Sequence, residues 1–239
     1  MPLLESVPNV SEGRDLAAVA AIAAAFGRCA HVLDVHSDAD HHRSVLTLVA
    51  REDELVDALL AGIACAVERI DLRRHEGVHP RVGAADVVPV VPLAAADMPL
   101  ARAVAEEAGR RVGAELGVPV FLYAASAGGV RPAYFRRGGP EELQRRIDAG
   151  ELSPDFGPDR LHPSAGAVLL GARHVLVAFN VELAGAELED ARAIAAAVRE
   201  SSGGLPGVQA LGLRLPRSGR VQVSLNLVDL SRVSLAEVV

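Results

Sequence analysis

The sequence contains no lysine, so its 24 lysine-or-arginine positions are all arginine, against 31 acidic residues. The absence of lysine excludes a Schiff-base amine and the P-loop, whose lysine contacts phosphates. Arginine offers instead a planar guanidinium that can hold a carboxylate with two parallel hydrogen bonds. The formal net charge of −7 disfavours nucleic acids and anionic membranes as partners.

Cysteine and long apolar segments are also scarce. Cys29 and Cys65 lie in apolar helical surroundings without a CxxC spacing, so we expect buried, reduced thiols. The N-terminus has no basic segment followed by an apolar one, and no window is long enough for a transmembrane helix. These features predict a soluble cytoplasmic protein of one large domain or two small ones.

The order of elements predicted for the first half of the chain is βαββαβ, which is typical of an α+β fold of the ferredoxin-like (split βαβ) type. β-Branched and apolar runs indicate strands, and apolar residues at helical spacing indicate helices. Pro89 and Pro92 favour an edge position or an early end for the fourth strand. The strands are expected at residues 3–10, 31–35, 44–50 and 86–93 and the helices at 15–26 and 52–70, extended by a helix at about 100–116 and a strand at 118–123.

The rest of the chain divides into an irregular segment and a second set of elements. Residues 124–165 are rich in glycine, proline and arginine, and we expect a functional loop or a linker with one helical stretch near 141–147. The order βαββ is then predicted, from a strand at 174–183, a helix at 188–200 and a hairpin of residues 208–215 and 221–227 around Ser218-Gly219.

We therefore predict two ferredoxin-like subdomains with mixed or antiparallel sheets, at residues 1–173 and 174–239. The second is expected to be shortened at its C-terminus, because the closing helix and strand of the unit are missing from the pattern. Its sheet would then have an unpaired edge that a second chain could cover.

The densest group of chemically active side chains is HEGVHPRVG at residues 75–83, between a predicted helix and a predicted strand. Histidine can accept and donate protons near neutral pH. Pro80 disfavours helical backbone at His79, and Gly77 and Gly83 allow turns on either side. We interpret the block as a rigid loop that orients an imidazole beside a cation able to bind a carboxylate; a polar turn between core elements is the alternative.

A second group follows the strand at 31–35, and its members are Asp34, His36, Asp38, Asp40, His41, His42 and Arg43. Imidazole and carboxylate are common metal ligands, but these residues are nearly consecutive, which does not place three of them on one face. A solvated acidic turn is a further alternative. We favour a substrate-facing loop in which Arg43 binds a carboxylate.

Three further segments combine small, apolar and polar residues. PDFGP at 154–158 and HPSAGA at 162–167 would let a planar ligand approach the backbone, with Phe156 stacking on a ring, although a linker would have the same composition. VPNVSEG at 7–13 is also compatible with simple helix capping. Tyr123, Arg131 and Arg136 add polar groups from the long irregular segment.

Taken together, these blocks resemble the formiminotransferase family, which includes glutamate formimidoyltransferase and the transferase half of formiminotransferase-cyclodeaminase. The matching blocks occur in order and cover nearly the whole chain. They are VPNVSEG (7–13), LDV (33–35), HRSV (42–45), RHEGVHPR (74–81), GA (83–84), DV (86–87), VPV (118–120), LY (122–123), PDFGP (154–158), HP (162–163), GAR (171–173), AFN (178–180) and SLNL (224–227).

The resemblance implies transfer of a formimino group from N-formimino-L-glutamate to N5 of tetrahydrofolate in histidine degradation, by a homodimer that needs no metal. It places the catalytic histidine on His79. Its folate-binding segment falls on Gly157, Pro158, Asp159, Arg160, Leu161, His162, Pro163, Ser164, Ala165 and Gly166. The cyclodeaminase half is absent from the sequence.

The chemistry of this reaction suggests further roles. His79 would accept the proton that N5 loses and then protonate the departing glutamate nitrogen. Arg43 and Arg81 are candidates for the two carboxylates of the donor, and Asp34 could orient an imidazole or stabilise the cationic amidine.

Two residues of the expected donor site depart from the family pattern. His42 stands where family members usually have asparagine, and His36 where the mammalian enzymes carry an acidic residue.

The alternatives to formimino transfer are formyl transfer from N-formylglutamate to tetrahydrofolate, a folate-binding homologue without catalysis, and a metal-dependent hydrolase.

Overall fold

The computed structural model describes residues 2–77, 80–230 and 232–238. The predicted catalytic residue, His79, therefore lies outside the described residues. The chain divides into two compact units, Met1–Arg173 and His174–Val239, and each is described here by itself. No helix in the described part of the chain is both long enough and apolar enough to cross a membrane.

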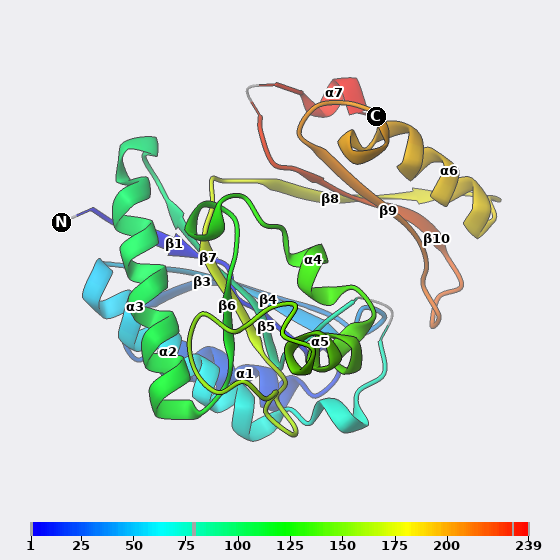
Figure 1. The fold of residues 1–239 in the computed structure, drawn as a ribbon. Coiled ribbons are helices and arrows are strands. Elements are labelled where there is room, and N and C mark those ends of the chain that lie inside the picture. The colour runs from blue at the N-terminus through cyan, green and yellow to red at the C-terminus, as the bar shows by residue number, and fades with distance from the viewer. Residues whose placement is uncertain (1, 78–79, 231, 239) are drawn as a thin grey trace. The chain divides into compact units, whose positions relative to one another are not determined.

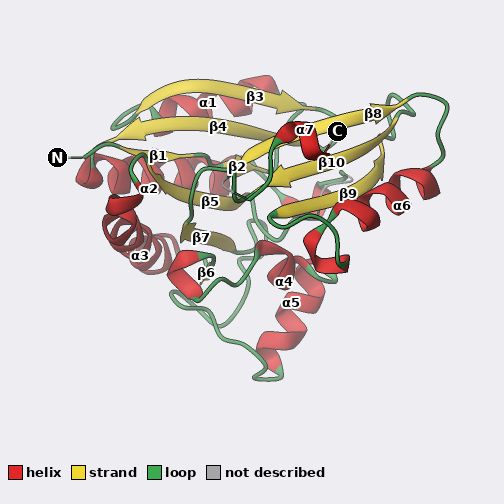
Figure 2. Cartoon of the chain, turned by 90° about the horizontal axis from the view of Figure 1, so that it is seen from above, coloured by secondary structure: helices red, strands yellow, loops and turns green. Residues whose placement is uncertain are grey.

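The first unit is built on one mixed sheet with the strand order β3–β4–β1/β2–β5–β7–β6 (Figures 1 and 2). β1 and β2 form one interrupted strand that pairs antiparallel with both β4 and β5. β7 runs parallel to β5 and to β6. The strands are β1 (Leu4–Ser6), β2 (Asn9–Val10), β3 (His31–Asp38), β4 (Arg43–Ala50), β5 (Ala85–Pro92), β6 (Val120–Leu122) and β7 (Val168–Ala172).

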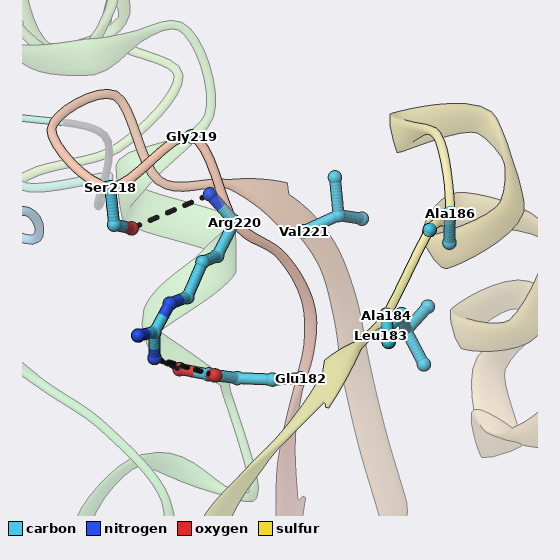
Figure 3. A pocket seen from close by; sticks show the side chains of 9 residues that line it. Glu182, Leu183, Ala184, Ala186, Ser218, Gly219, Arg220 and Val221 are labelled. Atoms are coloured by element: carbon cyan, nitrogen blue, oxygen red, sulfur yellow. Dashed lines mark hydrogen bonds and ion pairs between the residues drawn. The ribbon is translucent and has the colours of Figure 1, made fainter.

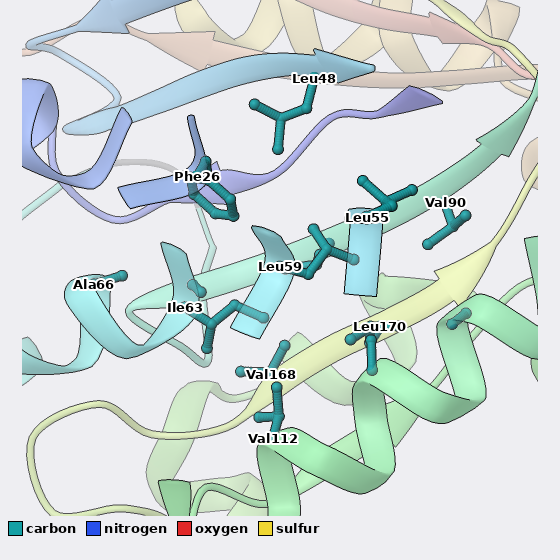
Figure 4. Packing of buried hydrophobic residues seen from close by; sticks show 14 of the residues in the cluster. Phe26, Leu48, Leu55, Leu59, Ile63, Ala66, Val90, Val112, Val168 and Leu170 are labelled. Atoms are coloured by element: carbon teal, nitrogen blue, oxygen red, sulfur yellow. The ribbon is translucent and has the colours of Figure 1, made fainter. Parts of the chain in front are cut away.

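Three helices cover one face of this sheet, α1 (Leu16–Phe26), α2 (Glu52–Arg69) and α3 (Met98–Leu116). α2 begins with three acidic residues and ends with Arg69, which suits the helix dipole. Its apolar stripe of Leu55, Leu59 and Ile63 is fully buried in the main core (Figure 4). These helices and β3 and β4 confirm the sequence-based prediction to within a few residues.

A smaller core lies on the opposite face, where residues 124–165 fold back over β5, β7 and β6. This segment contains α4 (Pro132–Arg136) and α5 (Gly139–Asp148), so it is more ordered than predicted. Phe135, Leu143 and Ile147 pack with odd-numbered strand residues such as Phe121 and Leu169. Strand residues alternate between faces, so the even-numbered Val168 and Leu170 join the main core. Short 3₁₀ segments occur at Leu72–Arg74, Ala95–Asp97, Ala125–Ala127 and Glu200–Ser202.

The predicted edge position of β5 is wrong, because β5 lies between β1/β2 and β7 and every one of its residues is buried. Pro89 is tolerated there for a local reason. Its carbonyl accepts a hydrogen bond of 2.6 Å from the Ser6 hydroxyl, so Pro89 faces the place where the paired strand is interrupted between Ser6 and Asn9. The backbone N–H that proline lacks is therefore not needed for a continuous ladder.

The second unit has a three-stranded antiparallel sheet of order β8–β10–β9. Its elements are β8 (Val177–Leu183), α6 (Leu188–Val198), β9 (Val208–Arg214), β10 (Val221–Leu227) and α7 (Leu235–Val238). The β9–β10 hairpin and the preceding helix confirm the predicted βαββ order. Ala191 and Ala195 of α6 pack on Val223 and Leu225 of the sheet.

The expectation for the cysteines is wrong. Cys29 is exposed in the turn that follows α1, and Cys65 is only half-buried on α2. Both thiols are free, but neither is sealed in the core.

Candidate active site

Backbone hydrogen bonds join the end of the histidine block to the predicted folate-binding segment. The N–H of Ala84 donates to Ala165 O at 2.9 Å, and the N–H of Ala167 donates to Val82 O at 2.9 Å. Gly166, between these two bonds, has a φ of 68°, and a Cβ atom there would lie 2.1 Å from Val82 O. The close approach of the two segments therefore requires glycine.

Asp86, near the start of β5, fixes the backbone that follows the histidine block. Its Oδ1 accepts hydrogen bonds from the N–H groups of Val82 at 2.7 Å and Gly83 at 3.2 Å. Its Oδ2 is paired with Nη2 of Arg136 from the end of α4. The Asp86 residue is only 3% exposed, so this carboxylate needs a cationic partner. Sequence reasoning noted Asp86 only within a family block and Arg136 only as a polar group of the long segment.

Arg81 ties the histidine block to the turn between β3 and β4. Its Nη2 donates to His41 O at 2.8 Å, and its Nη1 donates to His42 O at 3.0 Å and to His75 Nε2 at 2.6 Å. Burial, opposed by Asp86 and assisted by Arg136 and Arg43, lowers the pKa of Arg81 to about 10. These contacts give Arg81 a positioning role that its predicted role in substrate binding did not include.

His42 connects the same turn to the start of the first helix. Its Nδ1 lies 2.8 Å from Glu76 O and its Nε2 lies 3.0 Å from Glu12 Oε1, so both ring nitrogens face oxygen acceptors. The ring stacks on that of His75 with centroids 3.9 Å apart. The φ of His42 is +49°, a left-handed conformation in which asparagine and histidine are both enriched. The same backbone position therefore suits either residue.

Glu12, a member of the VPNVSEG block that was not predicted as a site residue, anchors this connection. Its Oε1 accepts backbone hydrogen bonds from Gly13, Arg14 and Asp15 at 2.7–2.9 Å. Burial raises the pKa of Glu12, but these backbone bonds and His42 outweigh it, and the pKa is lowered overall. Asp15 caps α1, so the alternative of simple helix capping accounts for part of the role of the VPNVSEG segment. The contact of Glu12 with His42 gives the segment a second role.

A small hollow in the first unit lies among these residues and is lined by Asn9, Val10, Ser11, Arg43, Arg81 and Asp86. Burial lowers the pKa of Arg43, as does the nearby Arg136, whereas Asp86 and Asp38 raise it. Arg43 and Arg81 thus lie near the Asp86 carboxylate, which pairs directly with Arg136. The other two nearby carboxylates have histidine partners, Glu12 with His42 and Asp38 with His41.

The structure brings only some of the predicted donor-site residues together. His42, Arg43 and Arg81 lie in the cluster just described. Asp34 and His36 pair with Thr47 and Val45 of β4, and the five residues from Asp34 to Asp38 span about 13 Å along the strand. Arg43 pairs with Asp38, so Asp34 and His36 lie farther along β3 than the position of Arg43. Both are exposed.

The acidic turn before His42 is largely satisfied by its own hydrogen bonds. Asp38 accepts from the N–H groups of Asp40 and His41 at 2.8 Å and pairs with the His41 ring at 2.8 Å. Across residues 2–77, 80–230 and 232–238, no group of three histidine, cysteine or acidic side chains is arranged to hold a metal ion.

Within the segment from Gly157 to Gly166, the chain forms a compact turn. His162 and Gly166 exchange two backbone hydrogen bonds of 2.9 Å, and the His162 Nδ1 accepts from the N–H of Ala165 at 3.0 Å. The interpretation of Phe156 as a stacking residue is not supported, because its half-buried ring packs on α3 beside Gly109 and joins the main core.

A larger hollow in the second unit lies between the end of β8 and the β9–β10 turn (Figure 3). Its charged lining consists of Arg220 and Glu182, which form an exposed ion pair of 2.8 Å. None of the predicted site residues lines it.

The fold defines an α+β protein of two compact units, and comparison with known proteins identifies its family. Residues 3–173 match the N-terminal subdomain of the formiminotransferase domain, and the chain belongs to this family. It is 42% identical to the glutamate formimidoyltransferase of Thermoplasma acidophilum over 96% of this chain and 78% of that protein. It is 37% identical to the Streptococcus pyogenes enzyme of the same name, over 98% of this chain and 80% of that protein.

The chain also matches a longer relative. It is 39% identical to the formimidoyltransferase-cyclodeaminase of Sus scrofa over 95% of this chain but only 44% of that protein. The family resemblance predicted from the sequence blocks is confirmed.

Proposed function

We propose that this protein transfers the formimino group of N-formimino-L-glutamate to N5 of tetrahydrofolate, a step of histidine degradation and one-carbon metabolism. The names of its relatives in Thermoplasma and Streptococcus support this reaction. The structural observation that carries it is the backbone ladder between residues 82–84 and 165–167. The ladder holds the histidine block beside the segment from Gly157 to Gly166, as an enzyme joining donor and folate requires.

In this proposal His79 acts as general base and then as general acid. It accepts the proton that N5 loses on attack at the amidine carbon and returns it to the departing glutamate nitrogen, so no net proton is consumed by the residue. Arg81 and Asp86 support this role, because they fix the block through His41 O and His42 O on one side and through Val82 N on the other.

The charge of the site fits a dicarboxylate donor. Arg43 and Arg81 lie near the Asp86 carboxylate, which pairs with Arg136, and Asp38 adds a further negative charge near Arg43. N-formimino-L-glutamate carries two carboxylates, which guanidinium groups bind well. We assign Arg43 and His42 to donor binding and retain Asp34 and His36 as proposed contacts on the same face of the sheet.

We further propose that the two units are the ferredoxin-like subdomains of a cytoplasmic homodimer. Strands β3–β4–β1/β2–β5 follow the order expected for a βαββαβ unit, and β9–β10–β8 repeat its first three positions. The assignment of dimer and compartment follows the family resemblance, and light scattering of the purified protein tests the dimer.

The experiment is a direct assay of glutamate release from N-formimino-L-glutamate with and without tetrahydrofolate. We expect release only when both substrates are present, and loss of that release in His79→Ala with an unchanged circular dichroism spectrum. His31→Gln, an exposed position on β3, is the matched control. Glutamate release from N-formylglutamate but not from N-formimino-L-glutamate would contradict formimino transfer. Folate binding without turnover of either donor would indicate a binding protein.

A further inference from the structure

All backbone polar groups of residues 82–84, where the histidine block ends, have hydrogen-bond partners. Those held by other parts of the backbone or by Ser11 are bonded at 2.7–2.9 Å: Ala84 N to Ala165 O, Ala167 N to Val82 O, Ser11 N to Ala84 O and Ser11 Oγ to Gly83 O. The N–H groups of Val82 and Gly83 are the exceptions, because both donate to Oδ1 of Asp86. A side-chain carboxylate therefore holds the part of this stretch that lies nearest His79 in the sequence.

Arg136, at the end of α4, pairs directly with this carboxylate. The side chains of Arg136 and Asp86 are 16% and 5% exposed, and Nη2 of Arg136 donates to Oδ2, the oxygen that does not receive the two backbone N–H groups. A buried carboxylate needs a cationic partner to remain ionised. An ionised carboxylate is also a stronger hydrogen-bond acceptor than a neutral one. Arg136 therefore orients Asp86 and strengthens its hold on the end of the block.

The position of Arg136 is itself fixed by the packing of α4. Phe135 is buried beside Phe121 of β6, which fastens α4 to the sheet. The buried Arg146 of α5 donates from Nη1 to Tyr134 O at 2.8 Å and lies 4.4 Å from the centre of the Tyr134 ring, which holds α4 against α5. The ion pair of Arg136 thus links a well-packed helix to the backbone of the histidine block.

We propose that Arg136 is a positioning residue for the transfer reaction. It acts through Asp86 on the backbone of residues 82–83 and so determines where the histidine block presents His79. This proposal rests on the proposed transferase function and adds to it a residue that contacts neither substrate. Displacement of a reacting group by about 1 Å can lower a rate by about a hundredfold. Arg136 should therefore govern kcat and leave both KM values nearly unchanged.

The kinetic test compares Arg136→Gln and Arg136→Lys in the full chain, with Arg137→Gln as the control because Arg137 is adjacent and exposed. For Arg136→Gln we expect kcat to fall about tenfold to a hundredfold, with the KM values for N-formimino-L-glutamate and tetrahydrofolate changed by less than about threefold. Arg136→Lys should recover part of kcat, because it keeps the charge but loses the planar fork. Either KM raised about tenfold or more, or a kcat within about twofold of wild type, would overturn the proposal.

Asp86→Asn tests whether Arg136 acts through Asp86. This variant should also lower kcat, and the double variant Asp86→Asn/Arg136→Gln should lose no more activity than the less active single variant. Losses that multiply would show a separate route of action and would overturn the proposal. Arg43 and Arg81 add positive charge near Asp86, which favours folding of Arg136→Gln. If urea unfolding shows that this variant is not folded, Arg136→Lys replaces it with the same signs expected.

Amide hydrogen exchange followed by NMR tests the positioning without turnover. In Arg136→Gln the N–H groups of Val82 and Gly83 should exchange at least about tenfold faster than in the wild type, because their acceptor is held less firmly. The N–H of Ala84 donates to Ala165 O and should keep its wild-type rate, which makes it an internal control. Unchanged rates at Val82 and Gly83 would overturn the proposal. Faster exchange there, in a protein whose wild type transfers no formimino group, would overturn the transferase function and leave the hold of Arg136 on the block established.

Discussion

Acidification from pH 7.5 to 5.0 should destabilise the first unit through His75. The His75 Nε2 lies 2.6 Å from Arg81 Nη1, which can only donate, and 3.0 Å from His42 O, which can only accept; only a neutral ring can accept the hydrogen bond from Arg81. Burial, and then the charges of Arg81 and His42, lower the pKa of His75 to about 4. A proton on His75 would break this bond and add a cation beside Arg81.

The sign and size of the effect follow from proton linkage. The folded pKa lies below the unfolded value of about 6.5, so the unfolded chain binds more protons between these limits. The stabilisation is complete above about pH 6.5 and is lost as the pH falls toward 4. Between pH 7.5 and 5.0 the full effect would be about 2 kcal/mol. Because His75 is only half-buried, solvent screening reduces the expected loss to about 1 kcal/mol.

Urea unfolding followed by circular dichroism at the two pH values measures this loss. Glu12 and Asp38, whose pKa values are also lowered, remain ionised at pH 5.0 and contribute little to the difference. His75→Gln should remove about 1 kcal/mol of the pH dependence, and His31→Gln at an exposed position should leave it unchanged. An equal loss of stability in His75→Gln and in the wild type would refute the reasoning.

Three further perturbations have defined outcomes. His79→Ala should lower kcat by about two to four orders of magnitude while urea unfolding stays unchanged, and a kcat within about twofold of wild type would remove His79 from the mechanism. Gly166→Ala should destabilise the protein by about 1–3 kcal/mol in urea and lower kcat, because its Cβ would lie 2.1 Å from Val82 O; wild-type stability would disprove the required close approach. Leu59→Ala, fully buried, should cost about 2–5 kcal/mol, whereas the exposed Leu16→Ala should cost far less.

The elements that sequence periodicity predicted best are those with one exposed face. α2 shows its apolar stripe clearly, since its other face is charged, and β9 and β10 are bounded by a recognisable turn. β7 was not predicted at all. It is a five-residue strand between β5 and β6 that is buried on both faces, so it has no alternation of polar and apolar residues to reveal it.

The site shows a different limit of sequence reasoning. Residues 75–83 were recognisable because their chemistry is concentrated in one block. The partners that fix this block come from distant positions, Glu12 from before α1 and Arg136 from the end of α4. A single signal for these partners was present in the sequence, since Asp86 is a carboxylate within an otherwise apolar strand and a buried carboxylate requires a compensating charge. With arginine at every lysine-or-arginine position, composition could not single out its partner, and only the packing of α4 against the sheet places Arg136 beside Asp86.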